Sequence, residues 1–453
     1  MLKSISQEPD KTKPQFYRRK LPETCIPFTS NDGKELFREA LASGHMDCYF
    51  KLAAQFRTQD EPAYCGLSTL VMILNALEID PGMVWKGPWR WYHENMLDCC
   101  IPVKVVEQEG ITFGQFICLA ECNGLETLSK CVNDEVSIES FREIIVRYTK
   151  QDESLIALSY SRKVLGQTGD GHFSPVGGYH PGKDLALIMD TARFKYPPHW
   201  VPLSLLFEAM KATDKSTGKP RGYVVLNRKP RCQTLLLFRI SDSFDVTMKN
   251  ACRENIGVFL NRWKSWLSQS IGTNHTIEEV SKGAVNCLLR SSHDVPAGQY
   301  IFSTQLDIQC LHGVSKEHFC DIEMLMAELE KNQMFEIVSD ILSKGQPNCN
   351  LKMFGQSSIC ISISGDDSTN DLETSCIKRC LHCLQPAHFI SLFLLSWPYQ
   401  TLPELKCETN GYILNYNVCT IVASSNAKYL GIEVRMLRKQ FKVLLSAGVK
   451  CGC

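Results

Sequence analysis

The sequence has no excess charge of either sign, because Lys and Arg together number 49 and Asp and Glu together also number 49. This balance excludes the basic composition typical of chains that bind nucleic acid or an anionic membrane through net charge. The longest apolar run, FISLFLLSWPY at 389–399, is far shorter than the roughly 20 residues of a membrane-spanning helix. We therefore expect neither a nucleic-acid nor a membrane partner, and we interpret the run as a buried helix or strand pair.

The sequence also lacks a targeting signal. Residues 1–20, MLKSISQEPDKTKPQFYRRK, have no apolar core of a secretory signal, and their acidic residues and prolines disfavour a transit helix. We therefore expect a cytoplasmic protein. Nor is there a nucleotide-binding loop, since the glycine-rich GQTGDGH at 166–172 precedes a predicted strand and lacks the required lysine.

Cysteine, in contrast, is abundant. The chain has 22 cysteines, which in a reducing compartment are not expected to form a disulfide framework. Such a density of free thiols indicates soft-metal chemistry or redox sensitivity. The alternative for any single position is a buried cysteine that serves as a small hydrophobic side chain.

The length of 453 residues favours two domains, with a boundary in the polar, glycine- and proline-containing stretch around residue 228. Residues 1–228 have an α+β pattern. Within them, helices are predicted at 31–44 and 65–78, and strands at 154–161, 172–179, 185–190 and 222–227. Residues 229–453 are predicted to form a cysteine-rich, mixed α/β domain with helices at 251–270 and 321–343.

Cys65 is the first candidate for chemistry. It stands behind Pro62, which disfavours helix before it, and at the head of the apolar run CGLSTLVMILNAL. A helix beginning there would direct its unsatisfied amides and positive dipole end at the sulfur, which favours a thiolate nucleophile. A core thiol at a helix start remains the alternative.

A base and its orienting group are available in a predicted hairpin. His172 begins one strand and Asp190 ends the next, and a tight turn centred on Pro181 would set them opposite each other. Cysteine, histidine and aspartate would then form a nucleophilic triad, although a shift of one residue would separate the pair. Gln59, six residues before Cys65, could donate to an oxyanion together with the Cys65 amide.

The stretches FRTQDEPAYCGLSTLVMILNAL, LDCCIP, GHFSPVGGYH and DTARFKYPPHWVPL resemble phytochelatin synthase, the glutathione γ-glutamylcysteinyltransferase family of plants. The resemblance covers roughly residues 12–228 and implies a papain-like cysteine protease fold there. It assigns the nucleophile to Cys65, the acid/base to His172, the aspartate to Asp190 and the oxyanion glutamine to Gln59. It further implies that glycine leaves glutathione through a γ-Glu-Cys thioester, which is transferred to glutathione or to a growing phytochelatin.

The resemblance also implies partners. Glutathione and its metal thiolates would be the substrates, with cadmium, zinc or copper ions as activators and no organic cofactor, and a homodimer is left open. Because glutathione is anionic, Arg162, Arg193 and Arg221 are candidate substrate-binding residues. Each could instead be a structural arginine, and Arg193 could brace Asp190.

Two groups of cysteines are candidate metal ligands. In the first part of the chain they are two incomplete pairs, Cys99 with Cys100 and Cys118 with Cys122, for which core thiols are the alternative. In the second part, CIKRCLHC supplies Cys376, Cys380 and Cys383, near His382 and His388, and the final CGC supplies Cys451 and Cys453.

Two rival functions remain at this point. Water could attack the same thioester, which would make the protein a glutathione or glutathione-conjugate carboxypeptidase. Alternatively, the chain could be a non-catalytic metal-buffering module.

Overall fold

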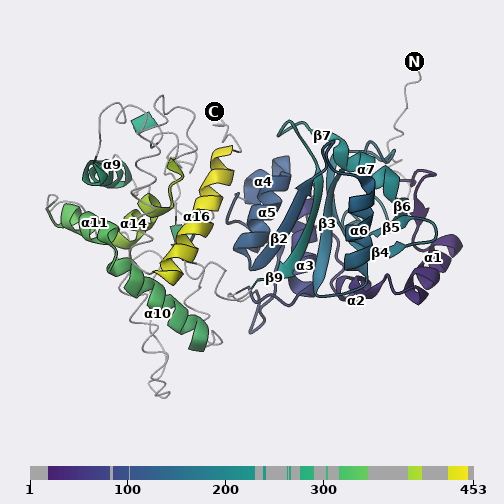
Figure 1. Ribbon diagram of the computed structural model, residues 1–453, viewed down its shortest axis with the longest axis horizontal. Helices are drawn as coiled ribbons and strands as arrows, with labels where there is room; N and C mark the ends of the chain where they lie inside the picture. Colours follow the sequence, from purple (N-terminus) through teal and green to yellow (C-terminus); the bar gives the residue numbers. More distant parts are fainter. Residues whose placement is uncertain are drawn as a thin grey trace, which may run out of the picture. The chain divides into compact units, whose positions relative to one another are not determined.

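The computed structural model describes residues 19–81, 85–101, 103–229, 238–240, 263, 265–266, 276–289, 302–304, 316–344, 386–399 and 427–446. The chain divides into two compact units (Figure 1). Unit 1 consists of Met1–Ile79, Val106–Ile117 and Glu126–Arg228, and unit 2 of Asp80–Val105, Cys118–Leu125 and Lys229–Cys453. The second unit thus contains two segments that precede residue 228.

Unit 1 is built on a seven-stranded sheet with the order β1-β6-β5-β4-β3-β9-β2. The pairings from β1 through to β9 are antiparallel. The strands are β1 (Ile26–Pro27), β2 (Leu125–Cys131), β3 (Ser154–Ser161), β4 (Gly171–His180), β5 (Leu185–Ile188), β6 (His199–Pro202) and β9 (Gly222–Arg228). A separate short pair is formed by β7 (Thr213–Asp214) and β8 (Lys219–Pro220).

Helices cover this sheet, which makes unit 1 an α+β structure as predicted. The helices of the first half of the chain are α1 (Asn31–Ala42), α2 (Asp47–Ala54), α3 (Cys65–Ala76), α4 (Val103–Glu109), α5 (Phe113–Cys122), α6 (Ile138–Thr149) and α7 (Leu203–Lys211), with a short 3₁₀ turn at Glu94–Met96. In Figure 1, α6 lies in front of the sheet and α3 behind it. Phe141 and Ile145 of α6 join Leu206 of α7 in one apolar cluster with the inward residues of the central strands.

The predicted elements that carry the candidate site are confirmed. The strand predicted at 154–161 is β3, and those at 172–179 and 185–190 are β4 and the slightly shorter β5. The helix predicted at 65–78 is α3, whose residues after Cys65 are all buried, because an all-round apolar helix needs cover on every side.

The register predicted for the β4–β5 hairpin is wrong. His180 pairs with Leu185, so the turn is centred beyond Pro181, and a β-bulge interrupts the ladder between Val176 and Gly178. A Cβ atom at Gly177 would lie 2.6 Å from the sulfur of Met189, so the bulged strand approaches its neighbour too closely for a larger residue. Asp190 therefore follows the end of β5 instead of pairing with His172 in the ladder.

The described part of unit 2 after residue 229 is mainly helical. It contains α9 (Ile277–Leu289), α10 (Lys316–Glu330), α11 (Gln333–Lys344), α14 (Pro386–Ser396), α16 (Lys428–Ser446) and a strand pair, β10 (Phe238–Ile240) with β11 (Phe302–Thr304). The helix predicted at 321–343 is two helices, α10 and α11. The apolar run at 389–399 lies largely in the buried helix α14, and most of the helix predicted at 251–270 lies outside the described residues.

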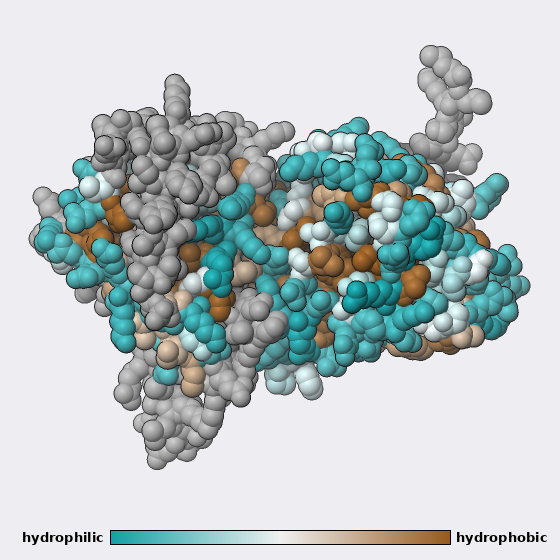
Figure 2. Space-filling view, viewed as in Figure 1, coloured by the Kyte–Doolittle hydropathy of each residue, from teal (hydrophilic) through white to brown (hydrophobic). Residues whose placement is uncertain are grey.

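Aromatic side chains form the centre of this helical part. Trp397 of the α14 segment lies 5.4 Å from Phe441 of α16 and 6.0 Å from Trp263 between ring centroids. Among the described residues, no helix is both long and apolar enough to cross a membrane. Where Figure 2 is coloured, the surface is largely hydrophilic, with hydrophobic residues gathered in small areas.

Candidate active site

Cys65 occupies the first position of α3. The turn before it is closed by a hydrogen bond from the Tyr64 amide to the Glu61 carbonyl, and Tyr64 is the residue that precedes the helix. Cys65 is partly exposed, whereas the rest of α3 is buried. Its sulfur therefore stands at the positive end of a helix, where a thiolate is stabilised.

His172 and Asp190 meet beside this thiol. His172 Nε2 lies 2.8 Å from Asp190 Oδ1, and the Cys65 thiol is hydrogen-bonded to His172 and to the backbone of Phe173. Because the carboxylate can only accept, Nε2 carries a hydrogen and Nδ1 is the nitrogen left for the sulfur. The three residues are thus brought together in the order that general-base activation of a thiol requires.

Arg162 is a fourth member of this group. Its Nη2 donates to Asp190 Oδ2 at 2.7 Å, while the backbone amide of Ala192 donates to Oδ1 at 2.9 Å. Nη2 also lies 2.7 Å from His172 Nε2, and since both nitrogens carry hydrogens they are two donors that share one carboxylate. Arg162 is only 2% exposed, so Asp190 is held from two sides in a buried setting.

The hydrogen-bond chain continues away from the triad through two buried residues. Arg162 Nη1 donates to Gln167 Oε1 at 2.6 Å, and Gln167 Nε2 lies 2.9 Å from His199 Nε2. His199 Nδ1 lies 2.8 Å from the carbonyl of Pro197, which can only accept. His199 is therefore protonated on Nδ1 and accepts from Gln167 on Nε2, so every donor in the chain has a defined direction.

The electrostatics of the site favour a charged thiol and a charged imidazole. Burial alone would raise the pKa of the Cys65 thiol, but the charge and hydrogen bond of His172 lower it below its usual value. Burial and Arg162 lower the pKa of His172, and Asp190 and Cys65 outweigh them, so that it is raised. Despite burial, His172 and Arg162 hold the pKa of Asp190 well below its usual range. Both shifts on the reacting pair favour a thiolate next to an imidazolium.

The region around Cys65 is similar to known proteins. The phytochelatin synthase family model matches residues 16–223, which include the whole group around Cys65. Glutathione gamma-glutamylcysteinyltransferase 2 of Arabidopsis thaliana is 34% identical over 450 residues, 95% of each chain. Glutathione gamma-glutamylcysteinyltransferase 1 of the same plant is 36% identical over 375 residues, 82% of this chain and 75% of that protein. The chain belongs to the phytochelatin synthase family.

The similarity is stronger over a shorter length in a fungal phytochelatin synthase relative. Glutathione gamma-glutamylcysteinyltransferase of Schizosaccharomyces pombe is 53% identical over 214 residues, which are 47% of this chain and 51% of that protein. Half of that relative is therefore matched, whereas nearly all of the second Arabidopsis thaliana protein is.

Gln59 is buried near the turn that leads to Cys65. Its side-chain nitrogen donates to the carbonyls of Glu61 and Pro62 at 2.8 and 2.9 Å, and its Oε1 accepts from Thr191. Its backbone amide donates to the carbonyl of Thr191, next to Asp190. Gln59 thus links the loop before Cys65 to the loop that carries Asp190. Both hydrogens of its side-chain amide are directed at the loop before Cys65.

The three predicted substrate-binding arginines lie in different surroundings. Arg162 is held by the triad, as described above. Arg221 is also buried and donates to the carbonyls of Ala212 and Thr213, with Asp170 Oδ1 at 3.3 Å. Arg193 is partly exposed and stacks on the ring of Phe56 at 4.9 Å. Only Arg193 of the three is open to solvent, and it is Arg162 that braces Asp190.

Gln167, His199 and Lys195 were missed from the sequence. Lys195 is partly exposed, and its pKa is lowered by burial and by the charges of Arg162 and Arg19, with Asp190 and Cys65 acting in the opposite direction. It is therefore a cation within electrostatic range of the nucleophile. The stretches GQTGDGH and ARFKYPPHW contain all three residues, but nothing in their spacing indicates that they meet Arg162.

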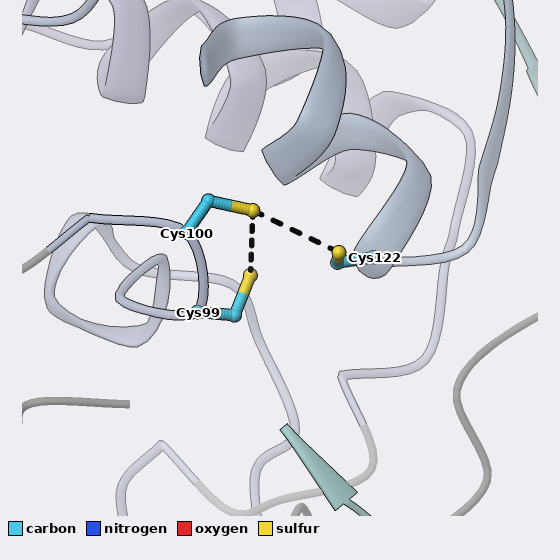
Figure 3. Close-up of side chains that lie close together, drawn as sticks. All are labelled: Cys99, Cys100 and Cys122. Atoms are coloured by element: carbon cyan, nitrogen blue, oxygen red, sulfur yellow. Dashed lines mark hydrogen bonds between the residues drawn. The ribbon is translucent and has the colours of Figure 1, made fainter. Parts of the chain in front are cut away.

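The two predicted cysteine pairs of the first half meet in one cluster within unit 2. Figure 3 shows the thiols of Cys99 and Cys100, from a loop, and Cys122, from the end of α5, turned toward one another. Sγ of Cys100 lies 3.8 Å from Sγ of Cys99 and 3.8 Å from Sγ of Cys122. Cys118 lies one turn earlier on α5, and Cys100 and Cys122 lower the pKa of its thiol. Residues of both predicted pairs therefore lie in one place, and three of the four sulfurs form a close group.

The remaining metal candidates lie outside the described residues. These are Cys376, Cys380, Cys383, Cys451 and Cys453, together with His382. His388 is described and is buried on α14, with its Nε2 3.1 Å from Glu330 Oε1.

Proposed function

We propose that this chain is a glutathione γ-glutamylcysteinyltransferase that makes phytochelatins by transpeptidation. The observation that supports the proposal most directly is the contact of His172 with Asp190 and Cys65 at the start of α3. This arrangement supplies an activated thiol, and the family supplies the acyl donor, since the relatives are named for glutathione as substrate.

We further propose that unit 1 is a papain-like catalytic domain within residues 1–228. A helix that begins at the nucleophile packs against an antiparallel sheet that carries His172 on β4 and Asp190 after β5. The aspartate accepts from His172 as the orienting member of a cysteine-histidine pair. The cysteine-rich remainder, 229–453, would modulate stability or the response to metal.

The first half-reaction makes a thioester. The Cys65 thiolate attacks the carbonyl of the Cys-Gly peptide bond of glutathione, forming the C–S bond of a tetrahedral intermediate. As the C–N bond breaks, the His172 imidazolium gives its proton to the departing glycine nitrogen. The products are free glycine and a γ-Glu-Cys acyl group on Cys65.

Stabilisation of the oxyanion is proposed for the Cys65 amide and the side chain of Gln59. In this structure both amide hydrogens of Gln59 bind the carbonyls of Glu61 and Pro62. One of these two bonds must be exchanged for the oxyanion when the intermediate forms. Gln59 would therefore act in the transition state and hold the loop before it.

The second half-reaction transfers the acyl group. His172, now neutral, removes a proton from the α-amine of a second glutathione or a growing chain, and the amine attacks the thioester carbonyl. The C–S bond breaks, the Cys65 thiolate is released, and the product is (γ-Glu-Cys)n-Gly. We propose that the acceptor is a metal bis-thiolate of glutathione, with cadmium, zinc or copper as the ion. A thiol and an imidazole supply all of this chemistry, so no organic cofactor is required.

Anchors for the substrate carboxylates are proposed from the accessible cations. Arg193 and Lys195 are partly exposed, and both follow Asp190 closely in sequence. Arg162 and Arg221 are instead engaged in buried contacts with Asp190, Gln167 and backbone carbonyls. We therefore assign substrate binding to Arg193 and Lys195, and positioning to Arg162 and Arg221.

The test is incubation of the purified chain with glutathione and cadmium, followed by mass spectrometry. The proposal predicts free glycine and (γ-Glu-Cys)n-Gly, both absent in Cys65→Ser and present in Cys131→Ser, which changes an exposed cysteine. γ-Glu-Cys without oligomers would show that water outcompetes the amine and that the protein is a carboxypeptidase. Metal binding without any turnover would exclude both enzymes.

A further inference from the structure

Three sulfurs from two segments converge in unit 2, with a fourth cysteine one helical turn away, at a place that the proposed chemistry does not use. Cys99 and Cys100 come from the loop before α4, and Cys118 and Cys122 from successive turns of α5. All four are at most 4% exposed. The ligand atoms of Cys99, Cys100 and Cys122 lie within 4.8 Å of one another.

The spacing of these sulfurs matches a metal ion better than a disulfide. A tetrahedral zinc ion with sulfur ligands at about 2.3 Å places neighbouring sulfurs about 3.8 Å apart. The two Sγ–Sγ distances from Cys100 are both 3.8 Å. A disulfide would need about 2.05 Å between the same atoms.

The surroundings of the cluster also suit a bound cation. Asn123 Nδ2 lies 3.7 Å from Cys99 Sγ and also donates to the Leu119 carbonyl at 2.8 Å, so the amide is oriented toward the sulfur. A donor to a ligating sulfur is an outer partner of the kind expected around a thiolate-bound metal ion.

We propose that Cys99, Cys100 and Cys122 hold one thiophilic divalent ion of the size of zinc, and that Cys118, one helical turn before Cys122, supplies the fourth thiolate. With Cys118 bound, four protein thiolates complete the tetrahedron, so that no position is left for a glutathione thiolate or water. Binding displaces the S–H protons to solvent and joins the loop at 99–100 to α5. The ion is therefore distinct from the metal carried by the substrate.

The site is tested by zinc content in the full chain, measured by mass spectrometry of the metal after loading and gel filtration. Cys122→Ser and Cys99→Ser should each hold one zinc fewer per chain than wild type, whereas Cys131→Ser should hold the same number. Zinc bound by the other cysteines is the same in wild type and variant, so it does not affect this comparison. Equal zinc in all four proteins would overturn the proposal.

A second variant leaves the four ligands in place. Asn123→Ala removes the donor to Cys99 and should weaken zinc affinity about tenfold, as loss of an outer partner typically does. Unchanged zinc affinity would show that Asn123 does not donate to a metal-bound sulfur and would count against the site.

Wild-type protein gives a readout that does not depend on any variant folding. After treatment with a zinc chelator, N-ethylmaleimide should label the peptides of Cys99, Cys100, Cys118 and Cys122 faster, while the buried Cys48 stays at its slow rate. Equal labelling before and after chelation, or a disulfide among the four cysteines, would contradict the metal site. Neither result bears on turnover at Cys65, so failure here is separate from failure of the proposed enzyme.

Discussion

At the scale of single residues, the site is defined by a carboxylate that several donors share. Asp190 accepts from His172, Arg162 and Ala192, and Arg162 in turn is fixed by Gln167 and His199. A buried carboxylate with this many donors stays ionised and fixes the orientation of the imidazole. Catalysis should therefore depend on residues that never touch substrate.

Arg162→Lys tests whether this arginine positions the triad or binds substrate. Lysine keeps the charge but cannot reach Asp190 and Gln167 at once, so kcat should fall about 100-fold with little change in KM, as expected from a slight misplacement of reacting groups. Steady-state kinetics with glutathione measures both constants. Arg142→Lys is the matched control, because Arg142 binds Asp184 with two hydrogen bonds. A raised KM with unchanged kcat would instead indicate that Arg162 binds substrate.

Asp190→Asn should narrow the pH range in which Cys65 is reactive. The Asp190 charge raises the pKa of His172, so its loss lets the imidazolium deprotonate at lower pH. With less imidazolium, the pKa of Cys65 rises and the thiolate forms only at higher pH. The alkaline limb of the pH–rate profile therefore moves to lower pH, and the acid limb moves to higher pH.

The measurement for this prediction is kcat/KM for the release of glycine from glutathione, followed against pH. Asp184→Asn is the control, since that carboxylate is also paired with an arginine. A profile that only loses height, with both limbs in place, would show that Asp190 has no electrostatic effect on the pair.

Lys195→Ala tests the proposed anchor for a substrate carboxylate. Loss of a charge-assisted hydrogen bond should raise KM for glutathione by about tenfold, and Lys195→Arg should largely restore it. Lys163→Ala, which changes an exposed lysine paired with Asp170, is the control. The assignment fails if the Lys195 and Lys163 variants have the same KM.

At the scale of elements, the sequence predicted the parts of the site but not their register. The helix at Cys65 and strands β3 to β5 follow from local signals, namely a proline turn, apolar runs and the hairpin residues. The bulge between Val176 and Gly178 lies where Gly177 packs against Met189 and Gly178 packs against Met46, and Met46 is far away in sequence. The carboxylate and imidazole still meet, because Asp190 follows the end of β5 instead of pairing within it.

The same limit applies to the network and the cysteines. Gln167 and His199 belong to a loop and to β6, and only the fold brings them to Arg162. Likewise the spacing within each cysteine pair is local, whereas the meeting of Cys100 with Cys122 depends on how a loop packs on α5. Long-range packing of this kind leaves no periodic pattern in a single sequence.

Gly222→Ala tests the close packing at the edge of the sheet. A Cβ atom there would overlap the Lys130 carbonyl oxygen, which is backbone and cannot rotate away. Strands β9 and β2 would have to separate, and the free energy of unfolding should fall by about 1–3 kcal/mol. Gly114→Ala, where a Cβ meets nothing within 4 Å, should leave stability unchanged or slightly raised. The free energy of unfolding of both variants is measured by urea unfolding. Equal midpoints of the two transitions would contradict the predicted overlap.

At the scale of the whole molecule, part of the first half of the chain is supported by the second half. Within unit 2, Lys229 donates from its backbone to the Gly124 carbonyl and from Nζ to the Glu121 carbonyl. Lys439 of α16 lies 2.6 Å from the Glu121 carboxylate. Glu121 and Gly124, at the end of α5 and just after it, therefore have partners that lie beyond residue 228.

A chain that ends at Arg228 should accordingly lose order in one place and keep it in another. Hydrogen exchange should accelerate at residues 118–125, whose partners are removed, while β3 and β4 keep their protection because their pairings lie within unit 1. Cys65 should be alkylated at the full-length rate, since every residue of its network also lies in unit 1. Equal protection of 118–125 in the two chains would show that these contacts do not support that segment. Loss of protection in β3 would show that unit 1 itself needs the second half.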